Sequence, residues 1–511
     1  MAANYRTTLP ITGASRGPQA ALILMIVPIV VGLLIFLVSY GALESYPFMF
    51  LVPWALALGV LMSVPLLILI YQRKFNFFNP LVFATWSYWV PAFVLGAIFL
   101  ATGLSNPYYL TLIDDVEYNL PYTMILIGLG FIGLTVGYFL PFGRRLGSYV
   151  ASFLPATEYR PSSFFIPGLI LLGIGVLNTI LAFWAGVFGY QLSAESNVYG
   201  GLIFASTFLR TQAIFLLVLT LFRQRTLNSM SIVIGAIVAV VSLAAILFAG
   251  SRGGIIQFFL TVFFAYMLSG RRVRLKQALI AGSALTIMML VGMIYGTTFR
   301  SVKGSEEAQS GEEYADNILR TFDRIRTDDT AETLQVGFSS LTGRVDIVSA
   351  VAVVVANHEQ LKPYEEAYGL DNNIWTDTTT FLIPRVLWKD KPYASDPRKF
   401  GDLYFNYGQS SFAITPVGDL LRNYGMPGVF FGMLIIGIII RFLYRTLLED
   451  QPIITWRATL YFMLITLLSY EGFYGTMIPI LFRVAFMSII GIVIVQFLAG
   501  RLDRTSERHA F

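Results

Sequence analysis

The chain of 511 residues has no cysteine and only two histidines, His358 and His509. Without cysteine it forms no disulfide and no thiolate metal site, and two histidines leave little for a zinc or haem centre. Charged residues are also scarce, at 13% against roughly 25% in soluble proteins. Hydrophobic residues make up 56% and the mean hydropathy is +0.69. We therefore expect an all-α polytopic membrane protein with no metal and no cofactor.

Twelve long uncharged stretches predict twelve transmembrane helices. They lie near residues 20–42, 48–71, 78–102, 119–141, 164–188, 201–222, 229–249, 252–270, 277–296, 424–446, 453–470 and 476–498. The first stretch is too long for the apolar part of a signal peptide, so we interpret it as an uncleaved membrane helix. The chain is thus predicted to begin in the cytoplasm.

The distribution of charge between these stretches predicts their orientation, because short loops rich in Lys and Arg stay in the cytoplasm. Alternate connections carry the cations, among them Arg73, Lys74, Arg144, Arg145, Arg160, Arg223, Arg271, Arg441 and Arg445. The other connections are acidic or uncharged and include Asp114, Asp115, Glu117 and Glu471. Both termini are therefore predicted to face the cytoplasm.

One long connection, residues 297–411, is predicted to lie outside the membrane. It contains 12 Lys or Arg and 18 Asp or Glu, which gives a net charge of −6. Loops of this length are usually functional. Within it, Val345 to Ala356 is apolar but too short to span, and we expect a helix lying on or between the membrane helices. The chain is thus predicted to have three regions, which are residues 1–296 with nine spans, the loop 297–411, and residues 412–511 with three spans.

Two arginines are predicted to lie deep in the outer half of the membrane. Arg210 belongs to the sixth predicted span and Arg483 to the twelfth. Charges inside a membrane are costly and indicate functional sites. Their similar depth favours a shared anion-binding cavity. The alternative is that each arginine reaches the interface or pairs with a glutamate such as Glu471.

Arg252 lies in a glycine-rich turn, Gly250 to Gly254, between the seventh and eighth predicted spans. A helix is expected to begin there, so its free N–H groups and the guanidinium would face the same place, which suits a phosphate. The alternative is a tight turn whose arginine contacts lipid headgroups.

Asp419 and Arg422 follow the loop at a spacing of three residues. If Pro416 opens a helix, the two share one face near the outer surface. The pair is then either a carboxylate and an anion ligand of a functional site, or a capping carboxylate with a structural ion pair.

The segment from Trp375 to Pro392 combines aromatic, hydroxyl and cationic side chains. Aromatic faces bind the apolar surfaces of sugars, and cations bind a diphosphate. The candidates in it are Trp375, Asp377, Arg385, Trp388, Lys389 and Lys391. An amphipathic segment resting on lipid headgroups has the same composition.

These features, in this order, resemble the Wzy-type polymerases of oligosaccharide repeat units, which build O-antigen and exopolysaccharide chains. The likeness rests on many spans, one large outer loop late in the chain, and four motifs. The motifs are Ser251 to Gly254, Phe381 to Arg385 with Trp388 and Lys391-Pro392, Thr415-Pro416 with Gly418-Asp419, and Tyr424-Gly425. Several family members have Gly-Glu where this chain has Gly418-Asp419, which shortens the reach of the carboxylate.

The resemblance implies a multispan, GT-C-like glycosyltransferase in the bacterial cytoplasmic membrane with its large loop outside. It would transfer a growing glycan from undecaprenyl diphosphate to an incoming lipid-linked repeat unit. Its partners would be this lipid-linked oligosaccharide, membrane lipid, a chain-length regulator and a flippase, and no nucleic acid. Arginines would stabilise the leaving diphosphate, with Arg252, Arg210, Arg422 and Arg385 as first candidates and Arg483, Lys389 and Lys391 as further ones. Asp419, Asp377 and Glu471, in that order, would accept the proton of the acceptor.

Two alternatives stay open. An O-antigen ligase shares this layout, and the sequence argues against it only through the motifs and the absence of a catalytic-looking histidine beyond His358. A transporter or flippase of lipid-linked sugars would have charges in both leaflets and broken helices in matching halves. Here the deep charges are predicted in the outer half only.

Overall fold

The protein is a helical polytopic membrane protein. The computed structural model describes residues 47–508 except 106, 186–198, 225, 227, 250–251, 272–274, 304–310, 328–336, 338, 340–341, 384–386, 389, 392–394, 409–411 and 413. The described residues contain helices and no strand. The first predicted span, residues 20–42, lies outside them.

Eight described helices are long and apolar enough to cross a membrane. They are Leu51–Tyr71, Pro80–Ala101, Val116–Phe139, Pro161–Trp184, Gly201–Arg223, Ser229–Phe248, Thr415–Leu447 and Tyr474–Asp503. Each corresponds to a predicted span. The polytopic class is thus confirmed, whereas a total of twelve spans stays a prediction.

Three predicted spans differ from these eight. Residues 252–270 form α11 (Arg252–Leu268), a shorter apolar helix, and residues 277–296 lie within α12 (Leu275–Lys303). The predicted span 453–470 is wrong in length, because α19 (Thr455–Thr466) has only 12 residues and irregular chain follows it. At about 1.5 Å per residue, α19 is too short to cross a bilayer.

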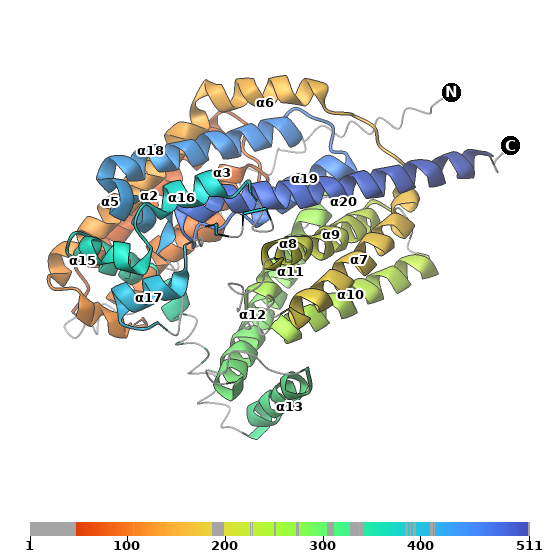
Figure 1. Cartoon of the computed structure of the whole chain (residues 1–511). Helices are drawn as coiled ribbons and strands as arrows, with labels where there is room; N and C mark the ends of the chain where they lie inside the picture. Colours follow the sequence, from red (N-terminus) through yellow and green to blue (C-terminus); the bar gives the residue numbers. More distant parts are fainter. Residues whose placement is uncertain are drawn as a thin grey trace.

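Two groups of helices lie on either side of α20 (Tyr474–Arg508), as Figure 1 shows. The first group holds α2 (Leu51–Tyr71), α3 (Pro80–Ala84), η2 (Thr85–Leu95), α4 (Gly96–Ala101), η3 (Tyr108–Leu112), α5 (Val116–Phe139), α6 (Pro141–Phe153) and α18 (Thr415–Leu447). The second holds η4 (Pro161–Phe164), α7 (Phe165–Trp184), α8 (Gly200–Ser206), α9 (Phe208–Arg223), α10 (Ser229–Ala249), α11, α12 and α13 (Gly311–Thr327).

Glycines allow α5 and α6 to lie directly against α18. A Cβ atom on Gly133 or Gly137 would meet the backbone oxygens of Phe430 or Leu434, and one on Gly143 would meet that of Ile438. Small residues permit this close approach between membrane helices. Because these contacts advance in the same direction along both partners, α5 and α6 run parallel to α18.

Helix α18 is broken at Gly425, whose φ of 67° and ψ of −165° are not helical. Glycine adopts this conformation without the steric cost that a Cβ atom would add. Residues Thr415 to Arg422, in the first part, are all buried. The break thus separates a short buried helix, which carries Asp419, from a longer apolar one.

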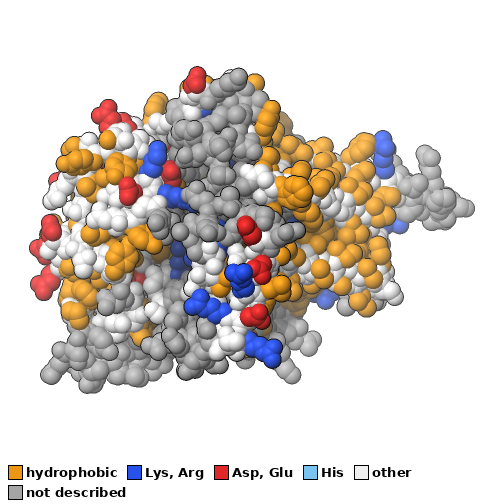
Figure 2. All heavy atoms as spheres, turned by 60° about the horizontal axis from the view of Figure 1, so that its bottom comes forward, with side chains coloured by type: hydrophobic (Ala, Val, Ile, Leu, Met, Phe, Trp, Pro, Cys, Tyr) orange, Lys and Arg blue, Asp and Glu red, His pale blue; other side chains and the backbone are white. Residues whose placement is uncertain are grey.

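Besides α13, the described part of the long connection contains α15 (Val348–Tyr368), α16 (Asn373–Thr380) and α17 (Pro397–Phe405), which lie among the membrane helices. Val348 to Val355 are buried, and α15 packs against α5 and α18. This confirms the prediction of a short apolar helix between the membrane helices. In Figure 1, α15 and α17 lie at the end of the molecule away from the two chain termini. Figure 2 shows hydrophobic side chains over much of the visible face, with acidic side chains at its left edge and others beside Lys and Arg near its middle.

Candidate functional site

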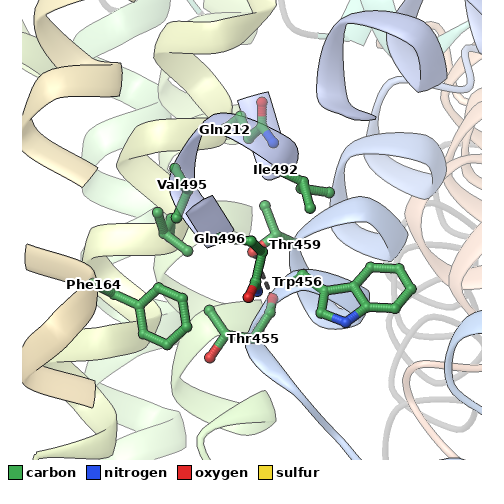
Figure 3. Close-up of a pocket in the computed structure, with 9 residues that line it drawn as sticks. Phe164, Gln212, Thr455, Trp456, Thr459, Ile492, Val495 and Gln496 are labelled. Carbon is green, nitrogen blue, oxygen red and sulfur yellow. Dashed lines mark hydrogen bonds between the residues drawn. The ribbon is translucent and has the colours of Figure 1, made fainter. Parts of the chain in front are cut away.

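A small cavity lies between α9, α19 and α20, at the predicted cytoplasmic end of the membrane (Figure 3). It has room for about one water molecule, and Gln212, Gln496, Thr455 and Thr459 supply its polar lining. No predicted site residue lines it. Asp377, Asp419 and Arg422 instead lie at the opposite end, where α15 to α18 and the start of α20 meet.

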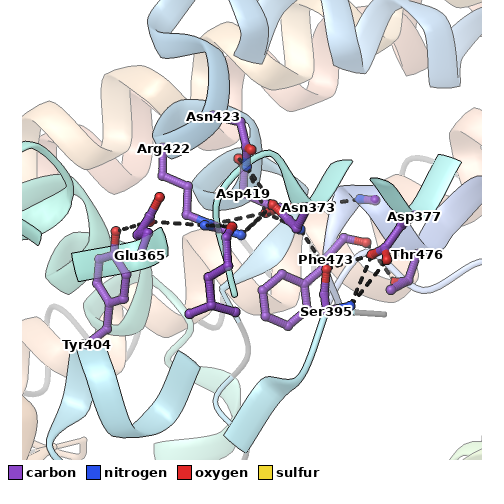
Figure 4. A network of polar contacts seen from close by, with 12 residues as sticks. Glu365, Asn373, Asp377, Ser395, Tyr404, Asp419, Arg422, Asn423, Phe473 and Thr476 are labelled. Carbon is purple, nitrogen blue, oxygen red and sulfur yellow. Dashed lines mark hydrogen bonds and ion pairs between the residues drawn. The ribbon is translucent and has the colours of Figure 1, made fainter. Parts of the chain in front are cut away.

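A buried polar network joins these helices, and Asp419 lies at its centre (Figure 4). Its carboxylate has no exposed surface. It accepts hydrogen bonds from Asn373 Nδ2 at 3.2 Å, Gly475 N at 3.1 Å and Asn423 Nδ2 at 3.3 Å. It also pairs with Arg422, whose Nη2 lies 3.0 Å away. Both carboxylate oxygens of Asp419 are thus occupied by groups of the protein.

Arg422 is equally enclosed. Its Nη1 atom donates to Glu365 Oε1 at 3.0 Å and to the Leu370 carbonyl at 2.9 Å, and its Nη2 atom donates to Asn373 Oδ1 at 2.5 Å. The Phe400 and Phe473 rings lie 5.5 and 6.0 Å from the guanidinium carbon. No surface of the Arg422 side chain is exposed.

This geometry favours the structural alternative for Asp419 and Arg422. The two share one face of α18 and form the ion pair between residues three apart that was the structural alternative. A diphosphate cannot reach a guanidinium that is buried and fully bonded, and an acceptor hydroxyl cannot reach this carboxylate. In this conformation the pair positions α15, α16 and α20.

Asp377 lies at the other edge of the network, on α16 and away from Glu365 (Figure 4). Its Oδ2 atom accepts a hydrogen bond from Ser395 Oγ at 2.6 Å. Burial raises the pKa of Asp377 above its ordinary range, and the negative charge of Asp419 raises it further. Hydrogen bonds from Ser395 and the positive charge of Arg483 act in the opposite direction.

Arg483 is partly buried in α20 and acts electrostatically on Asp377. The neighbouring Phe482 ring packs edge-on against Phe381, 5.2 Å between centroids, where the chain leaves α16. Within the part of the chain that the structure describes, the guanidinium of Arg483 has no hydrogen bond and no ion pair. It therefore differs from Arg422 in having donors that other groups of the protein leave unused.

Glu471 pairs with Arg344, at 2.5 Å between Nη2 and Oε1. The alternative in which Glu471 neutralises Arg210 or Arg483 is therefore wrong. The Glu471 side chain is 35% exposed, so it is the most accessible of the three candidate carboxylates. Its backbone oxygen accepts a hydrogen bond from Thr415 N at 3.3 Å, which places Glu471 beside the start of α18.

The shared cavity expected for Arg210 and Arg483 is not what the described contacts show. Arg210 donates to Thr179 Oγ1 at 3.2 Å and packs against Gly175 of α7. Arg483 instead lies beside Asp377 of α16. The two arginines thus contact different helices.

The remaining candidates lie along the segment after α16 or outside the described residues. Trp375 and Trp388 are 68% and 37% exposed, and Lys391 Nζ donates to the Ile383 carbonyl at 3.0 Å. Arg385 and Lys389 lie outside the described residues. Helix α11 begins at Arg252 as expected, but the side chain of Arg252 also lies outside the described part. His358 bonds to the Val355 carbonyl of its own helix, at 3.1 Å.

The family described as "Domain of unknown function (DUF8712)" matches residues 176–447, more than half of the chain. The chain belongs to the DUF8712 family. No curated protein and no solved structure matches it. The DUF8712 match includes Asp377, Asp419 and Arg422 and ends before Glu471 and Arg483, so the network joins residues inside and outside the matched region.

Sequence reasoning missed several neutral members of the DUF8712 network. Asn373 bonds to both Asp419 and Arg422, and Ser395 bonds to both Asn373 and Asp377. A Cβ atom on Gly475 would lie 3.1 Å from Asp377 Oδ2, so a side chain at this position would crowd the carboxylate. Neutral residues such as these are common in soluble segments and do not by themselves indicate a site in the sequence. Within the described ranges, no cluster of three His, Asp or Glu side chains is suited to hold a metal ion.

Proposed function

We propose that this DUF8712 protein is a membrane glycosyltransferase that polymerises oligosaccharide repeat units linked to undecaprenyl diphosphate. The observation that carries the proposal is Arg483, an arginine within a membrane span that has no hydrogen bond or ion pair among the described residues. A charged group within a membrane costs free energy, and the few that occur there usually have a function. A lipid diphosphate would supply hydrogen-bond acceptors for this guanidinium, because its phosphates stay at the membrane interface while its chain stays in lipid.

The guanidinium of Arg483 suits this leaving group. Its planar donors bind phosphate oxygens in pairs, and they stabilise the negative charge that develops when the glycosidic bond to the diphosphate breaks. The neighbouring segment supports this placement, since Trp375 and Trp388 expose aromatic surface and Lys391 adds a cation. In the proposed enzyme this segment and α20 hold the lipid-linked donor.

Asp377 is the proposed base. Burial raises its pKa, which brings it closer to the working pH, as a proton acceptor in catalysis requires. It would take the proton of the acceptor hydroxyl as that oxygen attacks the sugar carbon, while the electrons of the broken bond pass to the diphosphate. Asp419 and Arg422 hold α16 in place for this step, and Glu471 is the further candidate base.

The predicted orientation places this site outside the bacterial cytoplasmic membrane, with both termini inside. Twelve spans and a GT-C-like arrangement belong to the same proposal. Donor and acceptor would arrive through a flippase, and a chain-length regulator would act on the product. A ligase that moves a finished glycan to another lipid would use the same groups, so the reaction product decides between the two enzymes.

One observation favours a transporter of lipid-linked sugars as a second candidate. Helix α18 is broken at Gly425, and broken membrane helices often bind transported substrates. A transporter with two equivalent halves would have a matching break elsewhere. The described residues contain a second irregular span, η2, but its π-helix continues directly into α4. We therefore prefer the enzyme.

The test is the envelope glycan of cells that lack this protein and are complemented with wild type, Arg483→Gln or Arg73→Gln. Arg73, at the predicted cytoplasmic end of α2, is the matched control. We expect a ladder of glycan lengths with wild type and Arg73→Gln, and single repeat units on the outer lipid with Arg483→Gln. If full-length glycan stays on its lipid carrier in the deletion strain, the protein is a ligase. Repeat units held on the cytoplasmic face would make it a transporter.

A further inference from the structure

A second polar group of residues lies beside the buried network, and of its members only Glu471 has a role in the proposal so far, as the further candidate base. Its exposed part is the ion pair of Arg344 and Glu471, whose side chains are 59% and 35% exposed. Arg344 precedes α15, and Glu471 belongs to the connection between α19 and α20. Arg344 also acts electrostatically on Arg300, near the end of α12. The pair therefore lies where the two groups of helices approach each other, and it is reachable from outside.

Tyr88 approaches this ion pair from the third span. Its hydroxyl is buried and has no hydrogen-bond partner among the described residues, although both Glu471 and Arg344 act on it electrostatically. The Tyr88 ring stacks on Tyr470, with 6.0 Å between centroids. Buried hydroxyl groups normally have a partner, so an unpartnered one next to a carboxylate and a guanidinium requires an explanation.

The backbone that presents Tyr88 is unusual. Residues Thr85–Leu95 form a π-helix, which places Tyr88 differently from a regular α-helix. π-Helical turns are rare and are frequent at functional sites. Local irregularity of the third span thus coincides with an unused hydroxyl group.

Thr415 is the third unusual residue here. Its φ of 61° is strained for a side chain branched at Cβ. Its N–H group donates to the backbone oxygen of Glu471, and its buried hydroxyl has no partner within the described part of the chain. Three unusual features therefore surround Glu471, each on a different part of the fold. They are the unpartnered hydroxyl of Tyr88, the strained backbone of Thr415 and the exposed ion pair with Arg344.

The chemistry of these groups selects a class of ligand. The ion pair of Arg344 and Glu471 has no net charge, and it offers hydrogen-bond donors and an acceptor. The hydroxyl groups of Tyr88 and Thr415 can each donate and accept a hydrogen bond. The carboxylate of Glu471 disfavours a phosphate. Adjacent hydroxyls of a sugar match this set, because each donates one hydrogen bond and accepts others, and the tyrosine rings cover apolar sugar surface.

We propose that Tyr88, Arg344, Thr415 and Glu471 form a subsite for an uncharged sugar, separate from the diphosphate site at Arg483. The contacts described above support the binding of a sugar at this subsite. That this sugar belongs to the acceptor rests on the proposed function. The subsite would hold the non-reducing end of the incoming repeat unit while its lipid remains in the membrane.

The test uses the full-length protein in nanodiscs and two probes prepared from the deletion strain, its lipid-linked repeat unit and the oligosaccharide released from that lipid. Binding of the oligosaccharide is followed by tryptophan fluorescence, since Trp86 and Trp89 flank Tyr88. Polymer formation from the lipid-linked unit gives kcat and KM. The variants are Tyr88→Phe and Thr415→Val, with Thr415→Ser as the conservative variant. Tyr295→Phe removes a buried hydroxyl elsewhere, one that donates to the Leu247 carbonyl.

We expect Tyr88→Phe and Thr415→Val to weaken oligosaccharide binding and raise KM about five-fold or more with little change in kcat, as loss of a hydrogen bond to bound substrate does. Thr415→Ser should retain wild-type binding, and Tyr295→Phe should not change KM. Unchanged KM and binding in Tyr88→Phe would overturn the subsite and show that its hydroxyl is satisfied by water. Binding of inorganic pyrophosphate at this place, lost in Tyr88→Phe, would overturn the choice of an uncharged ligand.

The two proposals fail separately. If wild type forms no polymer but binds the oligosaccharide through Tyr88, the polymerase is refuted and the sugar subsite stands. If wild type forms polymer and no variant alters KM, the subsite is refuted and the polymerase stands. Absence of both polymer and binding refutes both.

Discussion

Arg422 and Arg483 are both arginines of membrane spans, yet the protein surrounds them in opposite ways. Arg422 has no exposed side-chain surface, two carboxylate partners and two flanking aromatic rings. Arg483 is partly buried and, among the described residues, acts on Asp377 without a hydrogen bond or an ion pair. An arginine whose donors are all occupied holds helices together, whereas one with unused donors is suited to bind an anion.

The same contrast separates the three candidate carboxylates. Asp419 has no exposed surface and is enclosed by donors from several helices. Asp377 is 5% exposed and, at the edge of the network, accepts hydrogen bonds from Ser395 alone among the described residues, and Glu471 is partly exposed. In the proposed enzyme, the carboxylates at the edge of the network therefore take part in the reaction, whereas Asp419 at its centre holds the helices in place. Three measurements test this distinction, and a fourth, at Asp346, tests the effect of burial on a carboxylate outside the network.

The largest effect is expected from Arg422→Met. It leaves Asp419 and Glu365 buried without their counter-charge, and removing one partner of a buried ion pair costs about 3–5 kcal/mol of stability. Thermal unfolding in detergent should show a strongly destabilised or unfolded protein. Arg501→Met, at the predicted cytoplasmic end of α20, is the control. A variant with wild-type stability and no activity would instead make Arg422 a ligand-binding residue.

Asp377→Asn should lower the rate of glycan transfer by roughly 10²–10⁴-fold, the usual contribution of a general base. A base works in its ionised form, so wild-type activity should rise with pH through the pKa of Asp377. Because burial raises that pKa, this rise should lie at higher pH than for an exposed aspartate. Arg483→Gln removes a charge that lowers the pKa of Asp377, so the rise in its residual activity, measured with purified protein, should lie at still higher pH. If the activity of Asp377→Asn rises over the same pH range as that of the wild type, Asp377 is not the base.

Asp346 predicts a pH dependence of stability that is independent of catalysis. Its carboxylate is buried and accepts hydrogen bonds from Ser105 and Ser349, and burial raises its pKa from the ordinary 3.8 to about 6. A raised pKa means that the folded state holds the proton more tightly. This stabilisation is complete below pH 3.8 and is lost as the pH rises through 6.

The loss should be on the order of 2 kcal/mol between pH 4 and pH 7. Unfolding of wild type and Asp346→Asn across this range measures it. The variant, which stays uncharged, should have a flatter profile and exceed the wild type above pH 6. Parallel profiles would show that Asp346 is ionised throughout.

The smallest effect is expected from Trp375→Ala. This side chain is 68% exposed on α16, and surface substitutions usually change stability by about 0.5 kcal/mol or less. A rise of about three-fold in KM for the lipid-linked substrate would fit an aromatic contact at the edge of the donor site. A loss of stability as large as that of Arg422→Met would mean that α16 depends on this ring.

Most of the helical organisation could be predicted from the sequence. Long apolar stretches predicted all eight of the helices that are suited to cross a membrane, and the apolar start of α15 was predicted to lie on or between membrane helices. The length of α19 could not be predicted. Its apolar sequence continues to Leu468, but the helix ends at Thr466 before the irregular connection to α20.

The candidate site was predictable only in its charged members. Asp377, Asp419 and Arg422 were recognised because charges are rare in this chain, and the structure does gather them. Asn373, Ser395 and Gly475 carry no such signal, and their contacts with the charged residues define the network. The shared cavity of Arg210 and Arg483 stays a prediction, because the two arginines contact different helices and similar depth in a membrane does not determine which neighbour a side chain faces.

The sequence by itself determined that the protein is a bundle of membrane helices and where most of these helices lie, because hydrophobicity is a property of each local segment. Only the tertiary structure decided which charges are neutralised. Arg422 pairs with a glutamate 57 residues away and Asp419 bonds to an asparagine 46 residues away. Such partners meet only when separate helices pack, and a buried charge is stable or reactive according to the partners it meets there.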